Sequence, residues 1–272
     1  MTDVTRVKTG GRTIGETLFS LKGVSFRVGG IQILPELDLD LETGRMTGII
    51  GPNGSGKSSL VKLLARQQVP STGSISFLGQ PLADYSNRDL ARRLAYMPQF
   101  TPSAEGMTVA ELAELGRFPW HGALGRMDDT DAAKVADAID RTGLRAFADR
   151  LVDSLSGGER QRSWLAMMLA QDAKCLLLDE PTSALDLAHQ AEMLKLVSDL
   201  TREKELTAIV VLHDINMAAR YCDEIIAVKA GQVVARGTPP EIVNAQTLAG
   251  LYDLPMGVMA HPATGQPLGY VL

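Results

Sequence analysis

Apolar and polar residues alternate near the start of the chain, as half-buried strands require. Leu37, Leu39 and Leu41 alternate with acidic residues, so that the leucines share one face and the carboxylates the other. Residues 18–26 and 74–78 are also strand-like in composition. We therefore predict an antiparallel sheet in this part of the chain.

The pattern changes between Thr101 and Asp153, where strand signals stop. Apolar residues spaced three and four apart predict helices over residues 109–115, 129–142 and 144–149. We expect a helical insertion with a surface of its own.

Strands and helices alternate beyond this insertion. The pattern predicts helices over residues 159–171, 187–203 and 215–221, strands over 175–178 and 207–212, and a hairpin of 225–228 with 232–235. Strands separated by helices of this length are typical of a mostly parallel sheet. The predicted fold class is α/β, with a mostly parallel sheet, an N-terminal antiparallel β-subdomain and an inserted α-helical subdomain.

The two ends of the chain differ from the middle. Residues 1–17 are polar and are predicted to be a disordered lead-in. The tail of residues 250–272 contains three prolines and shows no clear periodicity. We expect residues 18–249 to form the main domain, with its helical subdomain at about 101–153.

Composition and charge exclude several classes of protein. The 272 residues are 45% hydrophobic, which is ordinary for a globular core, and 27 basic against 32 acidic residues give a net charge of −5, which does not favour a nucleic-acid partner. Cys175 and Cys222 lie far apart, so we expect no disulfide framework and a reducing compartment. Residues 1–16 lack the apolar segment of a signal peptide, and no uninterrupted apolar run approaches the ~20 residues that span a bilayer. We expect a soluble chain that reaches a membrane only by docking on other subunits.

The most specific chemical pattern is a glycine-rich loop after the apolar run 46–50. It fits G-x-x-x-x-G-K-[ST], precedes residues with helical spacing, and consists of Gly51, Pro52, Asn53, Gly54, Ser55, Gly56, Lys57 and Ser58. Inward-pointing backbone N–H groups and a helix N-terminus suit a polyphosphate. We expect Lys57 to reach the β- and γ-phosphates and the Ser58 hydroxyl to bind Mg²⁺.

Polar side chains follow two of the predicted strands. Asp179 and Glu180 end the strand at 175–178, and the carboxyl ends of parallel strands face one crevice. Asp179 suits the Mg²⁺ shell, and Glu180 suits the base for an attacking water. His213 follows the strand at 207–212 and could bind the γ-phosphate, although a lone histidine is often structural.

A second glycine turn, Leu155 to Gln161, opens a helix. Ser156 is a plausible N-cap before Gly157, Gly158 and Glu159. The helix N-terminus could bind an anion, and helix capping alone is the alternative interpretation.

In this order the motifs resemble the nucleotide-binding subunit of an ABC transporter, over residues 18–240. The matches are 51–58 as Walker A, 155–161 as the signature, 178–180 as Walker B, 183–186 as the D-loop, Gln99 as the Q-loop and His213 as the H-loop. The resemblance implies ATP and Mg²⁺ as cofactors. It implies catalytic roles for Glu180, His213, Lys57 and Gln99, metal binding by Ser58, Gln99 and Asp179, and nucleotide binding by the residues from Gly51 to Ser59, by Ser156, Gly157, Gly158 and Glu159, and by Asp186.

Two positions depart from that family's pattern. Where members commonly stack an aromatic side chain on adenine, this chain has Val28, so another residue must supply the stacking or the stacking is weaker. Ser59 follows Ser58 where threonine is more usual, which keeps the hydroxyl.

Runs outside the nucleotide motifs narrow the resemblance. Residues 104–109, 116–126 and 212–222 are similar to the ATP-binding subunit of iron(III)-hydroxamate siderophore importers, although Trp120 and His121 could also be core filling. This similarity implies a homodimer that closes on ATP, a polytopic membrane permease docked on the helical subdomain, and indirectly a substrate-binding protein. It places the chain on the cytoplasmic face of the membrane. Two alternatives remain open: an ATPase subunit of the same kind that serves haem or cobalamin import, and a soluble ABC protein without a transport role.

Overall fold

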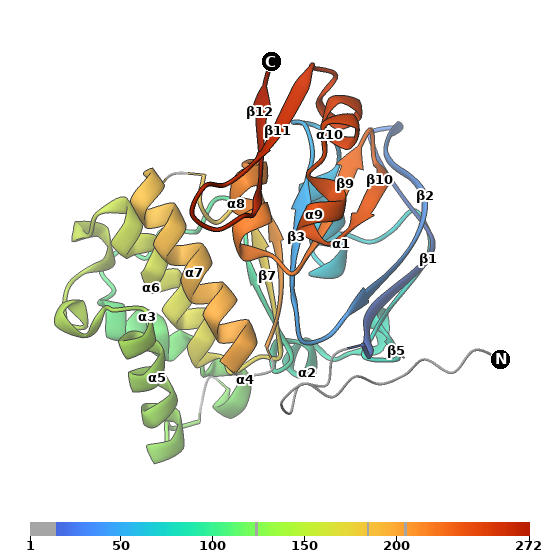
Figure 1. The fold of residues 1–272 in the computed structure, drawn as a ribbon. Coiled ribbons are helices and arrows are strands. Elements are labelled where there is room, and N and C mark those ends of the chain that lie inside the picture. The colour runs from blue at the N-terminus through green and yellow to red at the C-terminus, as the bar shows by residue number, and fades with distance from the viewer. Residues whose placement is uncertain (1–14, 123–124, 184, 204–205) are drawn as a thin grey trace. The chain divides into compact units, whose positions relative to one another are not determined.

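The computed structural model describes residues 15–122, 125–183, 185–203 and 206–272 (Figure 1). The chain divides into two compact units, the first made of residues up to Asp84 together with Ser198–Leu272, and the second of Tyr85–Val197. The predicted lead-in lies outside the described residues up to residue 14.

The first unit contains an antiparallel sheet, as the alternating pattern predicts. Its strands are β2 (Ile31–Glu42), β1 (Thr17–Val28), β4 (Thr72–Phe77) and β5 (Gln80–Pro81), in that order, followed by the short helix η1 (Leu82–Asp84). Phe19 and Phe77 face each other across β1 and β4, with ring centres 4.8 Å apart and both side chains fully buried. The leucines of β2 are buried while its aspartates are exposed, which confirms the predicted two-faced strand.

Four more strands of the first unit include its parallel pairs. They lie in the order β10 (Gln232–Gly237), β9 (Glu224–Lys229), β3 (Met46–Ile50) and β8 (Thr207–Val211), with β10 antiparallel to β9 at one side. β3 runs parallel to both β8 and β9, and every residue of β3 and β8 is buried. Burial on both faces explains why these strands read as continuous apolar runs. Helix α1 (Lys57–Leu64) follows β3, and α8 (Ile215–Tyr221) follows β8.

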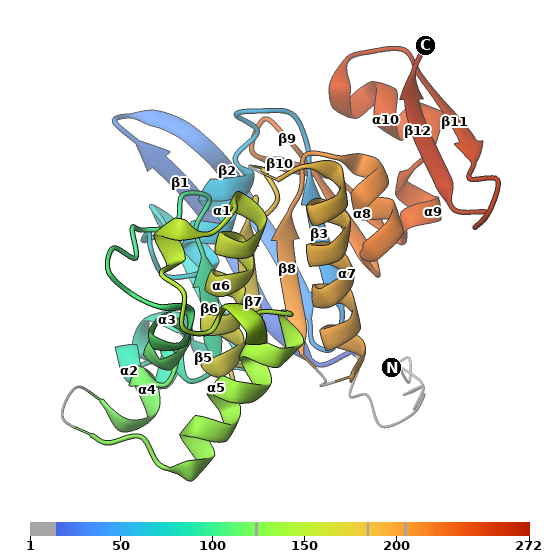
Figure 2. The ribbon, with the colours of Figure 1, turned by 90° about the vertical axis from the view of Figure 1, so that its left-hand side faces the viewer.

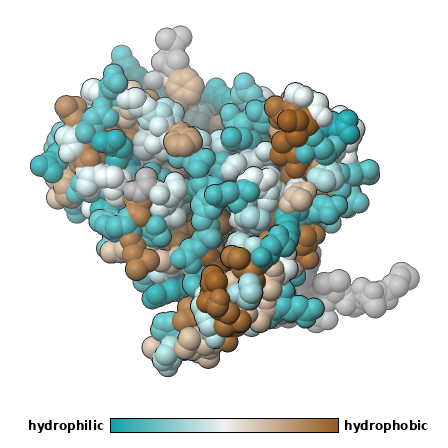
Figure 3. All heavy atoms as spheres, turned by 90° about the horizontal axis from the view of Figure 1, so that it is seen from above, coloured by the Kyte–Doolittle hydropathy of each residue, from teal (hydrophilic) through white to brown (hydrophobic). Residues whose placement is uncertain are grey.

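The tail has regular structure that its sequence does not reveal. Helices α9 (Pro239–Ile242) and α10 (Ala245–Tyr252) lead into it, and it forms an antiparallel hairpin of β11 (Met256–Ala260) with β12 (Pro267–Val271). The Asn216 side chain on α8 holds β12, since its Nδ2 donates to the Gly269 carbonyl at 3.1 Å and its Oδ1 accepts from the Gly269 N–H at 2.8 Å. Met259, Val271 and Leu272 stay exposed. In Figure 3, hydrophobic side chains drawn in brown gather on the part of the surface near the lower edge of the picture.

The second unit is mainly helical. It contains α2 (Asn87–Ala91), β6 (Leu94–Met97), α3 (Val109–Leu115), α4 (Phe118–His121), α5 (Asp129–Arg141), η2 (Arg145–Phe147), η3 (Val152–Ser154), α6 (Gly157–Ala170), β7 (Cys175–Asp179) and most of α7 (Leu187–Glu203). Helices α3, α5 and α6 enclose a core that includes Val109, Leu112, Val135 and Ala166 (Figure 2). The predicted helix at 144–149 is wrong, because Leu144 is not helical and only the single turn η2 follows it.

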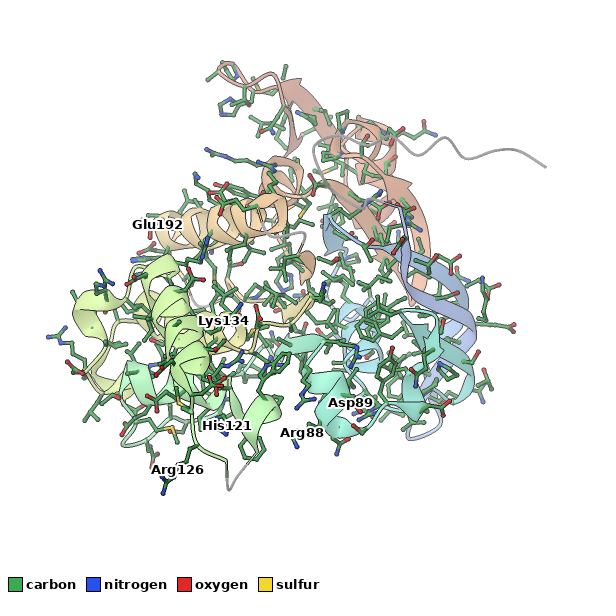
Figure 4. All side chains as sticks on the ribbon, turned by 90° about the horizontal axis from the view of Figure 1, so that it is seen from below. Arg88, Asp89, His121, Arg126, Lys134 and Glu192 are labelled. Carbon is green, nitrogen blue, oxygen red and sulfur yellow. The ribbon has the colours of Figure 1, made fainter. Side chains whose placement is uncertain are left out.

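The short helix α4 is fastened to its surroundings at several points. The guanidinium groups of Arg88 and Arg92 donate to the carbonyls of Pro119 and Trp120, and Figure 4 labels Arg88 on α2 beside α4. The Trp120 indole donates to the Gln171 carbonyl at 2.8 Å. The Arg92 guanidinium carbon lies 5.1 Å from the Trp120 ring centre. These contacts support the structural interpretation of Trp120.

Candidate nucleotide-binding site

The glycine loop joins β3 to α1, in the strand, loop and helix order that the sequence predicts. Gly51 has φ 149°, and a Cβ atom there would lie 2.0 Å from the Val228 carbonyl oxygen, so a side chain is excluded. Gly56, with φ 95°, is the N-cap of α1, and a Cβ atom there would lie 2.7 Å from Leu34 Cδ2. Glycine is therefore a requirement of the loop's own shape.

Lys57 is folded over this loop. Its side chain is buried, and Nζ donates to the carbonyl oxygens of Gly51 and Pro52, at 2.9 Å in each case. Ser58 and Ser59 follow in the first turn of α1, half-buried. A held ammonium beside a helix N-terminus is an arrangement suited to phosphate groups.

His213 lies at the same edge of the first unit as the loop. The Leu212 N–H donates to the Ile49 carbonyl at 3.0 Å, which keeps the end of β8 beside the end of β3. His213 is exposed, and Asp214 after it caps α8 by accepting from two backbone N–H groups. The glycine loop follows β3 and His213 follows β8, and these two strands are parallel, as expected.

Asp179 is the last residue of β7 in the second unit, and Glu180 follows it. Asp179 is fully buried. Burial of the Tyr96 hydroxyl, together with the negative charge of Asp179, raises the pKa of Tyr96 to about 12. Glu180 is nearly buried and has φ 53°, a left-handed conformation that is costly for a residue with a side chain. Such backbone strain is most common at functional sites, which makes Glu180 a candidate for one.

Gln99 contacts Glu180 directly. β6 and β7 pair in parallel with Met97 opposite Leu178, so the residues that follow the two strands meet. The Gln99 Nε2 donates to Glu180 Oε2 at 2.5 Å. In the sequence, the whole helical insertion lies between the two residues. No sequence pattern indicates this contact.

The second glycine turn begins α6, and Ser156 is the N-cap that the sequence predicts. Ser156 and Glu159 form a reciprocal capping box, in which the Glu159 carboxylate accepts from Ser156 N at 2.9 Å and Oγ at 2.7 Å. These hydrogen bonds lower the pKa of Glu159. Ser156 and Gly157 are exposed and Glu159 is half-buried, so the exposed start of the helix is open to a partner.

Asp186 immediately precedes α7 and interacts with His189, which the sequence analysis missed. Asp186 Oδ1 accepts from the backbone N–H of His189 at 2.9 Å and lies 2.8 Å from its Nδ1. The backbone hydrogen bond, followed by the one from the ring, lowers the pKa of Asp186. The available signal was a donor side chain three residues after a capping aspartate. Ala184, in the expected D-loop, lies outside the described residues.

The expected metal ligands are the Ser58 hydroxyl, the Gln99 amide oxygen and the Asp179 carboxylate. Oxygen donors of these kinds suit Mg²⁺. Within the described ranges, no group of three or more His, Cys, Asp and Glu residues could hold a metal ion. The first expected ligand belongs to the first unit and the other two to the second.

Val28, the expected adenine position, ends β1 and is 55% exposed. It lies directly before the Gly29-Gly30 turn, with no ring of its own to stack. None of the helices in the part of the chain that the structure describes is long and apolar enough to cross a membrane.

Comparison with known proteins identifies the class to which these features belong. Residues 34–183 match the family model described as ABC transporter, and the chain belongs to this family. It is a nucleotide-binding ATPase coupled to transport, of a kind that works as a dimer with membrane permeases.

Individual relatives cover most of the chain. It is 39% identical to the ferric enterobactin transport ATP-binding protein FepC of Escherichia coli (strain K12), over 93% of this chain and 94% of that protein. It is 39% identical to the iron(3+)-hydroxamate import ATP-binding protein FhuC of Bacillus subtilis (strain 168), over 87% and 88%. Among solved structures, a dimeric bacterial ABC transporter cassette, MJ0796, matches with a TM-score of 0.71 and 28% identity, over 81% of this chain and 98% of that one.

Proposed function

We propose that this chain hydrolyses ATP to energise the import of iron(III)-hydroxamate siderophores, as a peripheral subunit on the cytoplasmic face of the membrane. The observation that carries the proposal is the similarity over about nine-tenths of the chain to proteins named for iron-chelate transport. Relatives named for petrobactin, siderophore and achromobactin transport support this substrate class over haem or cobalamin.

The residues of the loop have separate tasks in this proposal. The backbone N–H groups of Gly51–Ser58 hold the phosphates, and Lys57 exchanges its two carbonyl acceptors for phosphate oxygens. Ser58, Gln99 and Asp179 would hold Mg²⁺, which when bound neutralises charge on the phosphates.

Glu180 accepts the proton of the attacking water, and the hydrogen bond from Gln99 fixes its carboxylate. His213 donates to the γ-phosphate and positions the water. Ser156, Gly157 and Gly158 of a second copy complete the γ-phosphate site, so hydrolysis requires the closed dimer. The structural support is that Ser156 and Gly157 are exposed and lie at a helix N-terminus.

The permease docks on a surface pocket of the second unit with a volume of about 390 Å³. Its lining combines the apolar side chains of Met107, Leu115, Phe118 and Met127 with the acidic side chains of Glu111 and Glu114 and the imidazole of His121. A short permease segment with an apolar side chain and a basic neighbour would suit this lining. Figure 4 labels His121, on α4 of this unit.

The test compares uptake of labelled iron–hydroxamate, haem and cobalamin in cells whose only copy carries Glu180→Gln. We expect loss of iron–hydroxamate uptake alone, with the purified variant still binding ATP and accumulating as a dimer. Loss of haem or cobalamin uptake instead would reassign the substrate. Unchanged ATP turnover in the purified variant would remove Glu180 from its role as the base.

A further inference from the structure

His189 makes two different contacts, one with each of the loops expected to lie at the nucleotide. Its Nδ1 lies 2.8 Å from Asp186 Oδ1, and because a carboxylate only accepts hydrogen bonds, Nδ1 carries the proton. The ring also lies against the signature turn, since a Cβ atom at Gly158 would be 2.6 Å from His189 Cδ2 and 2.9 Å from Cγ.

The geometry makes the ring a spacer between the two loops. One edge is held by Asp186, so the ring cannot turn away from Gly158 without losing that hydrogen bond. Gly158 is buried and has no φ that requires glycine, so the ring itself is what excludes a larger residue there. A simple N-cap aspartate needs only backbone N–H donors, which Asp186 already has from His189.

We propose that His189 is a positioning residue that sets the distance between Asp186 and the Ser156–Gly158 turn. The loop carrying Asp186 then moves together with the turn that binds the γ-phosphate of the other subunit. Through this link, closure of the dimer on ATP is communicated to the segment that follows Glu180. The inference rests on the proposed closed dimer.

A second link between α6 and α7 provides a matched control. Arg162 Nη1 lies 3.4 Å from Glu192 Oε2, one turn further along both helices, and Figure 4 labels Glu192 on α7. The Glu192 side chain is 64% exposed, and this ion pair touches neither Asp186 nor Gly158. Glu192→Gln therefore loosens the same helix pair without removing the spacer.

Three substitutions separate the hydrogen bond from the bulk of the ring. His189→Asn keeps a donor and an atom at the two positions bonded to Cγ, His189→Leu keeps only the bulk, and His189→Ala removes both. Each full-length variant, in the Glu180→Gln background, is assayed for ATP-dependent dimerisation by sedimentation and for ATP affinity of the monomer by calorimetry.

We expect roughly tenfold weaker dimerisation for Ala and Leu, the loss typical of a hydrogen bond to a charged group, with recovery in Asn. Monomer ATP affinity and thermal stability should stay unchanged, as should dimerisation of Glu192→Gln. When the same His189 substitutions are made in the protein that retains Glu180, kcat should fall in the Ala and Leu variants while KM for ATP does not. If all three His189 variants dimerise equally, the inference about His189 is wrong, but the proposed closed dimer is not affected. Absence of a dimer in Glu180→Gln itself would overturn the proposed dimer and the inference with it.

Gly158→Ala gives an independent test of the packing. In the presence of His189 we expect a strong loss of dimerisation, because the methyl group displaces the ring. Added to His189→Ala, the same change should cause little further loss. Losses that add in the double variant would show that the ring does not set the spacing.

Discussion

Arg117 and Asp131 form a buried ion pair. Arg145 and Asp140 form an exposed ion pair in the same unit with the same N–O distance. Arg117 Nε lies 2.8 Å from Asp131 Oδ1, with side chains 5% and 9% exposed. Arg145 Nε lies 2.8 Å from Asp140 Oδ1, with side chains 81% and 40% exposed. Replacing each arginine by methionine keeps an apolar stem and removes the same charge, so the two variants differ mainly in burial.

The expected costs differ severalfold. Arg117→Met leaves the Asp131 carboxylate buried without its cation and removes the donor at 2.7 Å from the Ala170 carbonyl. Removing one partner of a buried pair costs about 3–5 kcal/mol of unfolding free energy. Arg145→Met should cost about 0–1 kcal/mol, because solvent screens exposed charges.

Urea unfolding followed by tryptophan fluorescence measures this difference. Trp120 and Trp164, the two tryptophans of the chain, belong to the second unit, so the signal reports the unit that carries both arginines. With an m value of about 3 kcal/mol per M, Arg117→Met should lower the midpoint by roughly 1 to 1.7 M. The midpoint is the quantity to compare, because the Arg117 guanidinium lies 5.0 Å from the Trp120 ring centre and alters its emission. Equal midpoint shifts in the two variants would refute the argument from burial.

Two further predictions concern pH and the phosphate loop. Burial opposes ionisation of Asp131, but hydrogen bonds from the Arg117 side chain and the Asp128 N–H outweigh this effect and lower the pKa of Asp131. The ionised carboxylate therefore stabilises the fold at pH values above the usual pKa of an aspartate. This stabilisation is lost as the pH falls through the lowered value, so the gap between wild type and Arg117→Met should narrow below about pH 4, measured by urea midpoints across pH; a constant gap would contradict the assignment. Lys57→Ala should weaken ATP binding by roughly tenfold to a hundredfold in calorimetry, the range for charge-assisted hydrogen bonds. Lys62→Ala on the exposed side of α1 is the control, and equal losses in both would show that Lys57 has no special role.

The sequence predicts the parts of the fold whose cause is local. Mostly apolar runs predict β3, β7 and β8, because burial on both faces favours apolar residues along the whole strand. The alternation in β2 predicts its buried face, because only one face of this strand is turned to the core. The helix α8 is predicted with its observed bounds, residues 215–221.

Features that depend on distant partners could not be predicted. The hairpin β11–β12 has no alternation, because only some of its residues are buried and its support comes from Asn216, which is 53 residues from Gly269. The contact between Gln99 and Glu180 arises only when β6 and β7 pair. The position of His189 against Gly158 needs α6 and α7 in place. For the candidate site, the sequence gives the residue types and their order, and the folded chain gives the contacts between them.

The amide pair between Asn216 and Gly269 has a consequence for how the protein is made. Gly269 lies 53 residues after Asn216, and Asn216 lies three residues after His213. The ribosome must therefore have synthesised the chain as far as β12 before α8 can receive this support. The residues of the phosphate loop come before both partners in the chain, so they are synthesised earlier. The order of synthesis thus makes the support of the helix behind His213 a late event relative to the synthesis of the loop.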